Sequence, residues 1–325
     1  MELFGKVNID WLGKKWYFLS FSLIFSVLGI ISMCMHWAQI GSPVPLGVDF
    51  KGGTQVKVKF EQTPDINRIR QAVSAAGIKD ASVQPIADFN QTGGNEMLIS
   101  LPEQQNEAEL DSGRKQIVDA LRTYYPNPFK DSDVNVDVVG PTVGKQLENK
   151  AVLATLYSMA GMLVYLWFRF QLIYGVAAVV ACFHDTLITV GAFALTNQEI
   201  SLTVIAAILT LVGYSMNDTI VVFDRIRENL SLSRRESLPD VVNRSINQTL
   251  SRTVLTSGLT FLTVLSLYVF GGQVLRGFSF ALVIGIIIGT YSSIAVAAPM
   301  LVAWQEWRAK QGKTVVLPGA KRARV

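Results

Sequence analysis

The chain has 325 residues, of which half are apolar and 17% are charged. In soluble domains roughly a quarter of the residues are charged, so this low share predicts a protein that is partly embedded in a lipid membrane. The net charge of +4 at pH 7 would suit a nucleic-acid-binding protein. However, the basic residues lie at the margins of apolar runs with few aromatics among them. We therefore expect contact with membrane lipid and none with nucleic acid.

Cysteine and histidine are rare, with two of each in the chain. Cys34 and Cys182 both lie inside apolar runs, and we expect both to be buried thiols. No cluster of these residues has the spacing of metal ligands, and no nucleotide-binding loop or nucleophile-elbow pattern occurs. The sequence thus predicts no metal, no cofactor and no enzymatic activity, and an energy source other than ATP for any transport step.

The first apolar run covers residues 16–35 and follows Lys14 and Lys15. Its length of about 20 residues is enough to cross the hydrocarbon, and no small-x-small cleavage site follows it. We expect an uncleaved transmembrane helix after a cytoplasmic N-terminus at residues 1–15.

Residues 36–150 separate this helix from the next apolar run, and their pattern alternates between strand-like and helix-like periods. The expected elements are a strand at Val48–Phe60, a helix from about Pro64 to Ala76 closed by Gly77, strands at Ala81–Ile86 and Met97–Leu101 joined by a turn at Asn90–Asn95, a helix at Asn106–Tyr124 and a strand at Val134–Val139. The order βαββαβ predicts a small α+β domain of the ferredoxin-like type.

Five further apolar runs make up most of residues 151–304, which gives six transmembrane helices in all. They cover residues 151–168, 171–195, 202–223, 254–271 and 278–304. None is long enough to cross the membrane twice.

Basic residues set the expected orientation of these helices, because Lys and Arg resist translocation. They gather in residues 1–15, in the connection 224–253 and in the basic tail 305–325, whereas the short turns 196–201 and 271–277 contain one, Arg276. We therefore expect both termini in the cytoplasm and the domain at 36–150 in the periplasm. The connection 224–253 mixes charged and apolar residues, which favours an amphipathic segment on the inner membrane face; a solvated connecting loop is the alternative.

Asp218 is the most informative residue, since an ionisable side chain at a helix centre costs about 2.5 to 3.5 kcal/mol on insertion. It lies about 9 Å inward from the charged cluster that starts at Asp224, too deep for a short side chain to reach water. We expect it to face protein or a wet cavity and to act in transport. The alternative is a structural hydrogen bond between helices, aided by Asn217.

Arg252 precedes the fifth apolar run, where a basic residue most often places its charge at the membrane surface. It nevertheless approaches from the same inner side as Asp218. A guanidinium favours the charged form of a nearby carboxylate, so movement of Arg252 would change the proton affinity of such a pair. We therefore hypothesise that Asp218 and Arg252 hold and release a proton.

His184 and Asp185 lie near the middle of the third span. Consecutive helical residues point about 100° apart, so we expect these two not to face one spot. For His184, an interhelical hydrogen bond and a role in proton handling are both open. In the sixth span, Gly285 and Gly289 form a small-xxx-small face that predicts close helix packing.

Several segments together resemble proteins of the SecD/SecF family. The segment "GVDFKGG" at 47–53 is similar to the one that opens their extracytoplasmic domain. The runs "HDTLITVGAFAL" at 184–195, "LTVIAAILTLVGYSMNDTIVVFDRIRENL" at 202–230 and "INQTLSRTVLTSGLTFL" at 246–262 resemble the membrane signature of the SecF members. The resemblance covers nearly the whole chain, including the order of spans and outer domain.

The resemblance implies a half of an RND-type transporter in the bacterial inner membrane, with SecD supplying the other half of a twelve-span bundle. It implies association with the SecYEG channel, with YidC and YajC as further partners, and use of the proton-motive force to export unfolded preproteins. By motif, Asp218 would be the carboxylate of the proton path and Arg252 the cation that interacts with it. His184, Asp185 and Asn217 belong to the signature in a supporting role.

Other functions stay open at this point. One alternative is a structural adaptor between SecD and the channel, in which case the buried charges would not matter. An RND-type exporter of small molecules fits less well, because those proteins carry two larger outer domains. Sodium is an alternative to the proton as coupling ion, since carboxylates serve both.

Overall fold

Long helices dominate the protein, and among the described residues six are long and apolar enough to cross a membrane. The computed structural model describes residues 8–78, 81–86, 95–102, 107–170, 172–232 and 236–311. The spans are α1 (Lys15–Ile40), α5 (Pro141–Arg169), α6 (Leu172–Thr196), α7 (Leu202–Leu232), α8 (Leu238–Phe270) and a sixth made of α9 (Gly272–Ser292), a π-helical segment (Ser293–Ala297) and α10 (Ala298–Lys310). The protein is a multi-pass membrane protein, and the predicted helical fold with six spans is confirmed.

An antiparallel sheet with two helices forms the domain between α1 and α5. Its elements are β1 (Gly53–Lys59), α3 (Ile66–Ala75), β2 (Ser82–Ile86), β3 (Glu96–Pro102), α4 (Glu107–Tyr124), a 3-10 turn (Asp131–Asp133) and β4 (Val134–Val139). The strands lie in the order β2-β3-β1-β4, and every neighbouring pair is antiparallel. The chain thus follows the βαββαβ order that the residue pattern indicates.

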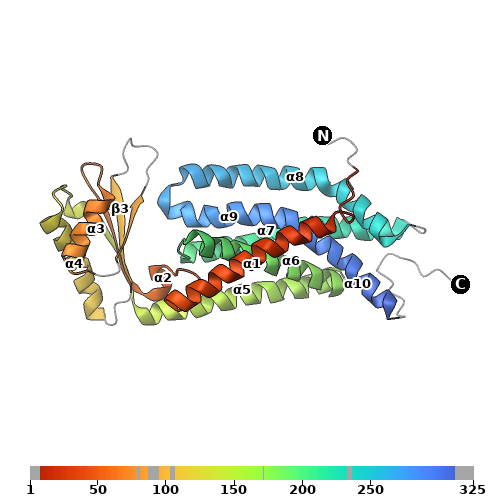
Figure 1. The fold of residues 1–325 in the computed structure, drawn as a ribbon, viewed down its shortest axis with the longest axis horizontal. Coiled ribbons are helices and arrows are strands. Elements are labelled where there is room, and N and C mark those ends of the chain that lie inside the picture. Colours follow the sequence, from red (N-terminus) through yellow and green to blue (C-terminus); the bar gives the residue numbers. More distant parts are fainter. Residues whose placement is uncertain are drawn as a thin grey trace.

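The core of this domain lies between the sheet and its two helices. Val56 and Val58 alternate with lysines along β1 and are fully buried, as are Ile69 of α3 and Leu121 of α4. This period of two on the strand, met by one apolar stripe on each helix, produces a two-layer domain. Figure 1 shows α3 and α4 on the side of the sheet that faces away from the spans.

The strand predicted at Val48–Phe60 is wrong in its first five residues. Val48–Lys51 forms a single helical turn, α2, and the strand begins only at Gly53. The reason is local: Gly52 has φ +77° and Gly53 has φ +136°, backbone conformations that only glycine adopts readily. Phe50 is consequently buried among the spans rather than in the sheet domain.

The sheet domain and α10 lie at opposite ends of the molecule (Figure 1). In α6, α7 and the sixth span, at least half of the residues of the apolar stretch are buried within the protein. In α1, α5 and α8 the corresponding shares are 11%, 11% and 17%. The exposed faces of these three helices are large and apolar. They are available to lipid or to another membrane protein.

The connection predicted at 224–253 is neither a surface-lying amphipathic segment nor a loop in its described part. α7 continues to Leu232 and α8 begins at Leu238, so both helices run without a break into this stretch. Ile226 and Ile246 are fully buried between the two extensions. The apolar residues of this stretch therefore pack helix on helix, which explains their helical spacing without contact with lipid.

Polar contacts also join these two extensions. The Asn229 amide donates to Ser245 Oγ at 2.8 Å and to Gln248 Oε1 at 2.7 Å, and Asn229 is only 4% exposed. Before α1, the Trp11 backbone N–H donates to Asn243 of α8 at 2.8 Å. The N-terminal segment is thus tied to the same helical hairpin.

The prediction that both cysteines are buried is wrong for Cys34. Cys182 is buried between helices, but Cys34 is exposed on α1, and both are free. An apolar run predicts burial in lipid and protein alike, and only packing separates the two. Residues 1–7, 90–94 and 312–325, which belong to the predicted N-terminus, turn and basic tail, lie outside the described residues.

Candidate functional site

Asp218 lies on the inner face of α7, with 2% of its surface exposed. Its Oδ2 accepts a hydrogen bond of 2.6 Å from Ser257 Oγ on α8. Thr290 of α9 directs its hydroxyl toward the same carboxylate, but its buried Oγ1 makes no hydrogen bond within the described part of the chain. The carboxylate therefore lies where three helices meet and accepts one direct hydrogen bond. Burial of a carboxylate costs free energy unless hydrogen bonds compensate for the lost water.

Arg252 lies on α8, five residues before Ser257, with an exposed side chain. Its charge is close enough to act on Asp218, but these two described residues form no ion pair within 4 Å. Five residues correspond to about 7.5 Å along a helix, a distance that a long arginine side chain can cover. The structure thus brings the two predicted residues near each other without joining them.

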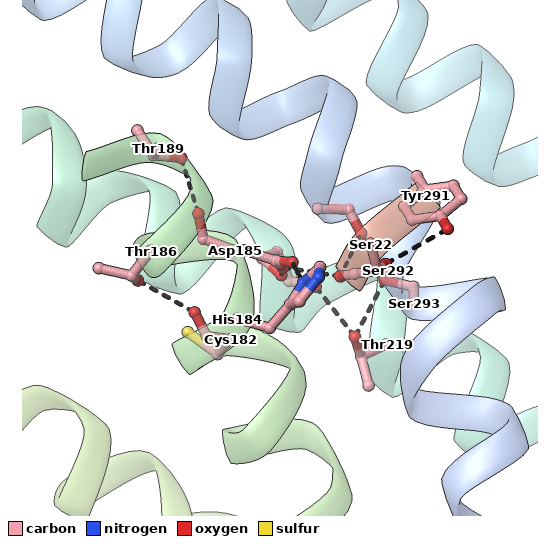
Figure 2. A network of polar contacts seen from close by, with 12 residues as sticks. Ser22, Cys182, His184, Asp185, Thr186, Thr189, Thr219, Tyr291, Ser292 and Ser293 are labelled. Carbon is pink, nitrogen blue, oxygen red and sulfur yellow. Dashed lines mark hydrogen bonds and ion pairs between the residues drawn. The ribbon is translucent and has the colours of Figure 1, made fainter. Parts of the chain in front are cut away.

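Asp185 is the centre of a second polar cluster in the spans, shown in Figure 2. Its Oδ2 accepts from Ser215 Oγ of α7 at 2.5 Å and from Ser292 Oγ of α9 at 2.7 Å. Its Oδ1 lies 3.0 Å from His184 Nδ1. This carboxylate is fully buried and ties α6 to both neighbouring helices.

The expectation that His184 and Asp185 do not face one spot is wrong. Their Cα–Cβ directions do differ, but an imidazole is long enough to fold back along its own helix and reach the next carboxylate (Figure 2). His184 Nε2 is buried and has no hydrogen-bond partner among the described residues. The helical angle alone is therefore a poor guide to contacts between a long and a short side chain.

Asn217 does not join either cluster. Its side chain is exposed on α7, and among the described residues it takes no part in the interhelical hydrogen bond of Asp218, which comes from Ser257. An exposed amide in the middle of a span suits contact with another membrane protein better than contact with lipid.

Gly285 and Gly289 lie on the face of α9 that meets α7. A Cβ at Gly285 would come within 2.4 Å of Leu211, and one at Gly289 within 3.1 Å of Ser215 Cβ. A second close contact joins α1 and α6, where a Cβ at Gly191 would lie 2.8 Å from Gly29 Cα. Small residues thus permit close packing at both contacts, α9 against α7 and α1 against α6.

Four consecutive residues at the junction of α9 and the π-helical segment reach three other helices. Thr290 faces Asp218, Tyr291 donates to the Phe18 carbonyl of α1, Ser292 donates to Asp185, and the Ser293 hydroxyl lies 3.0 Å from that of Thr219 on α7. The π-helical segment begins at Ser293. Such segments occur often at functional sites, because the extra residue per turn changes which side chains face a neighbour.

The hydroxyl donors Ser215, Ser257 and Ser292 are absent from the sequence prediction. Serine and threonine are frequent in spans, and most hydroxyls here simply return to a carbonyl one turn earlier, as Thr219 and Thr256 do. The one signal available was spacing, since Ser215 precedes Asp218 by three residues on the same face. No group of three metal-ligating side chains occurs in the described ranges.

An apolar groove of about 390 Å³ lies between α8 and α9, and Ser257 and Thr290 form part of its wall. The other lining residues are mainly aliphatic and aromatic, so the groove reaches the surroundings of Asp218 without offering a polar path. This groove as it stands therefore gives Asp218 no polar connection to its surroundings.

The junction between the outer domain and the spans is also specific. Asp49 of α2 accepts a hydrogen bond of 2.9 Å from the Leu202 N–H at the start of α7. Gly47 N–H donates to the Ile200 carbonyl at 2.9 Å. A Cβ at Gly144 in α5 would lie 2.5 Å from the Phe50 carbonyl oxygen. The segment around α2 is thus held between the α6–α7 turn and α5.

Comparison with known proteins gives consistent matches. Residues 120–307 match the family model of protein export membrane protein SecD/SecF, C-terminal, and residues 37–64 match the SecD/SecF GG motif. A protein translocase subunit SecF from Koribacter versatilis is 55% identical, with 98% of this chain and 97% of the relative aligned. One from Calditerrivibrio nitroreducens is 45% identical over 90% of this chain and 93% of the relative.

Solved structures agree with these relatives. The crystal structure of SecDF from Thermus thermophilus, described as a translocon-associated membrane protein, superposes with a TM-score of 0.77 at 35% identity. The match covers 92% of this chain but only 39% of that chain. A SecDF structure in a super-membrane-facing form gives 0.68 at 34% identity, with 96% of this chain and 40% of that one.

Proposed function

The chain belongs to the SecD/SecF family of protein export membrane proteins, as a SecF-type member, and from this we propose that it couples the proton-motive force to late steps of preprotein export. In this proposal it works in the bacterial inner membrane beside SecD and the SecYEG channel, with both termini in the cytoplasm. YidC and YajC are further proposed partners, and an unfolded preprotein is the substrate.

The observation that carries the proposal is the buried Asp218 carboxylate. It has one direct donor, Ser257, while the cation nearest in the same signature, Arg252, stands apart from it. A carboxylate with a detached guanidinium has two states available, paired and charged or unpaired and protonated. Exchange between these states would take up and release one proton at the junction of three helices.

The route for that proton would need a second protein. The groove beside Ser257 is apolar, and Arg252 on α8 and Asn217 on α7 are both exposed. A SecD subunit packed against these two helices would enclose the guanidinium and supply further polar groups. The junction of Asp49 with α7 would pass a helix movement on to the outer domain.

The test is export into vesicles that contain this chain, SecD and SecYEG, driven by an imposed pH gradient. We expect Asp218→Asn to reduce the gradient-dependent part of export to background, while the protein still inserts and co-purifies with SecD. Asp224→Asn is the matched control, since Asp224 lies on the same helix but is exposed. Full export from the Asp218→Asn protein would contradict the proposal. If export requires a sodium gradient instead of a pH gradient, the coupling ion is sodium and not the proton.

A structural adaptor is the second candidate, favoured by the small buried share of α1, α5 and α8. Such faces suit a chain whose main task is to hold SecD and the channel together. In that case Asp218→Asn would leave export intact, whereas bulky substitutions on these faces would reduce both co-purification and export.

A further inference from the structure

Asp185 is the most deeply placed carboxylate outside the proposed Asp218 site. It lies 13 residues after the start of α6 and 11 before its end, which corresponds to about 16–20 Å from either end of the helix. Its surface is fully buried. A charged carboxylate in that position requires a nearby proton or cation, because neither water nor lipid headgroups can solvate it.

The side chains around Asp185 supply hydrogen bonds but only one group that can carry a positive charge. Ser215 and Ser292 are neutral donors, at 2.5 and 2.7 Å. His184 Nδ1, at 3.0 Å, is the only titratable contact of the carboxylate among the described residues. An imidazole and a carboxylate that share one proton are neutral as a pair, whichever of them holds it.

Titratable groups on the helices packed against α6 have other positions or partners. Four of these groups contact other residues: Asp218 on α7 accepts from Ser257, Tyr291 on α9 donates to the Phe18 carbonyl, His36 on α1 contacts the Ser32 carbonyl and Asn197, and Arg169 on α5 pairs with Asp224. On α10, Arg308 and Lys310 lie in the last turn. On α6 itself, Cys182 lies one turn from Asp185. None of these described groups bonds to His184 or Asp185. The charge of Asp185 is therefore balanced within the pair, by a proton on His184 or on the carboxylate itself.

His184 also has an open position. Its Nε2 is buried and has no partner in the described part of the chain. A buried ring nitrogen of this kind is either a donor without an acceptor or an acceptor without a donor, and both are costly. Such an atom marks a place where a proton can be added or removed without breaking an existing hydrogen bond.

We propose that His184 and Asp185 form a proton-binding site of their own, separate from Asp218, whose occupancy sets the contacts of Asp185 with Ser215 and Ser292. An ionised carboxylate accepts from both serines at once. Transfer of the shared proton from His184 Nδ1 reaches Oδ1, the oxygen 3.0 Å away, and the neutral acid then offers Oδ2 to both serines as a weaker acceptor. Proton transfer within the pair therefore weakens the contacts of α6 with α7 and with α9.

This change would reach the surroundings of Asp218 over a short distance. Ser215 lies three residues before Asp218 on α7, and Ser292 lies two residues after Thr290, whose hydroxyl faces Asp218. His184 and Asp185 are thus positioning residues for the Asp218 site. Only this last coupling depends on the proposed function, since proton binding by the pair is a property of the chain alone.

Proton binding can be read directly, because His36 and His184 are the two histidines of the sequence. The full chain carrying His36→Gln, labelled with ¹⁵N histidine and placed in lipid vesicles, reports the protonation of the His184 ring by solid-state NMR. Infrared spectroscopy of an Asp218→Asn protein with ¹³C-labelled aspartate reports the protonated form of Asp185. Both are followed from about pH 5 to about pH 8, the range in which histidine titrates.

We expect at least one of the two signals to titrate in this range, and Asp185→Asn to move the His184 midpoint by about one pH unit or more. Thr189→Val is the matched control, because Thr189 is buried one turn away and its hydroxyl donates to the backbone carbonyl of Asp185, not to the carboxylate. It should leave the midpoint unchanged. The proposal is overturned if neither group titrates, or if His184 titrates identically in the Asp185→Asn protein.

Coupling is tested separately by export driven by a pH gradient. Ser292→Ala should shift the pH profile of export relative to the wild type, with Thr189→Val again as control. An unchanged profile would remove the positioning role and leave the proton site in place. Failure of Asp218→Asn to affect export would contradict the proposed function without altering either spectroscopic measurement.

Discussion

Asp49 accepts a hydrogen bond from the Leu202 backbone N–H, so a side chain of the outer domain's first segment caps the start of α7. The two residues are 153 positions apart in the sequence. α7 is also the helix that carries Asp218 and Ser215. The hydrogen bond therefore fixes the outer end of the helix whose centre holds the polar site.

Asp49→Ala should loosen this end of α7. Loss of a capping carboxylate typically costs about 0.5–2 kcal/mol, and the freed N–H groups should exchange faster with solvent. Hydrogen exchange followed by mass spectrometry should show the change at residues 202–205. Asp65→Ala is the control, since Asp65 caps α3 through Asn67 N–H at 2.9 Å and should affect only that helix. Equal exchange at α7 in both proteins would contradict the capping role.

Gly191→Ala should separate α1 from α6. The added Cβ would lie 2.8 Å from Gly29 Cα, a contact that backbone atoms cannot relieve without moving the helices. Overpacking of this kind costs about 1–3 kcal/mol. Thermal unfolding in detergent would measure it against Gly161→Ala, where the new methyl group meets nothing within 4 Å. We expect that control to be neutral or slightly stabilising.

Ser257→Ala should leave the Asp218 carboxylate without its direct donor. Leaving a buried polar group without its hydrogen-bond partner lowers the free energy of unfolding by about 1–3 kcal/mol. We expect lower stability and weaker gradient-driven export, and we expect Ser257→Thr, which keeps the hydroxyl, to retain most of both. An export assay and a thermal unfolding curve on the same preparations would separate the effects. Export that survives Ser257→Ala unchanged would show that the hydrogen bond is incidental.

Asn229→Leu should weaken the helical hairpin outside the membrane. It removes two hydrogen bonds to α8, while Ser245 keeps its bond to the Val241 carbonyl and Gln248 Oε1 still accepts from Arg225. The expected loss is about 1–3 kcal/mol, measured by the rate of limited proteolysis in α7 beyond the membrane. Ser231→Ala, an exposed position on the same helix, should stay within about 0.5 kcal/mol of the wild type.

The membrane fold could be predicted from the sequence because its signal is simple. Runs of about 20 apolar residues and the order of strands and helices at 53–139 depend on composition and period alone. The helical turn at Val48–Lys51 could not be predicted this way, since it depends on two glycines with positive φ and on packing of Phe50 among the spans. The straight continuation of α7 and α8 was missed because an amphipathic helix against lipid and one against another helix share the same pattern.

The site was predictable only in its charged residues. A buried Asp218 or Asp185 stands out because of its cost in lipid, whereas the serines that bind these carboxylates look like any other hydroxyl in a span. The contact between His184 and Asp185 depends on side-chain torsions that helical geometry leaves open. The distance between Asp218 and Arg252 depends on the tilt of two long helices and on how far a flexible side chain extends.

The unbroken course of α8 has a mechanical consequence. Its 33 residues measure about 50 Å, so the helix is longer than the hydrocarbon of a membrane is thick, about 30 Å. Ser257 lies in its middle, Asn243 and Ser245 lie near its start, and no break separates them. A small tilt of α8 at the carboxylate would therefore become a larger sideways displacement at the start of the helix, where a partner could sense it.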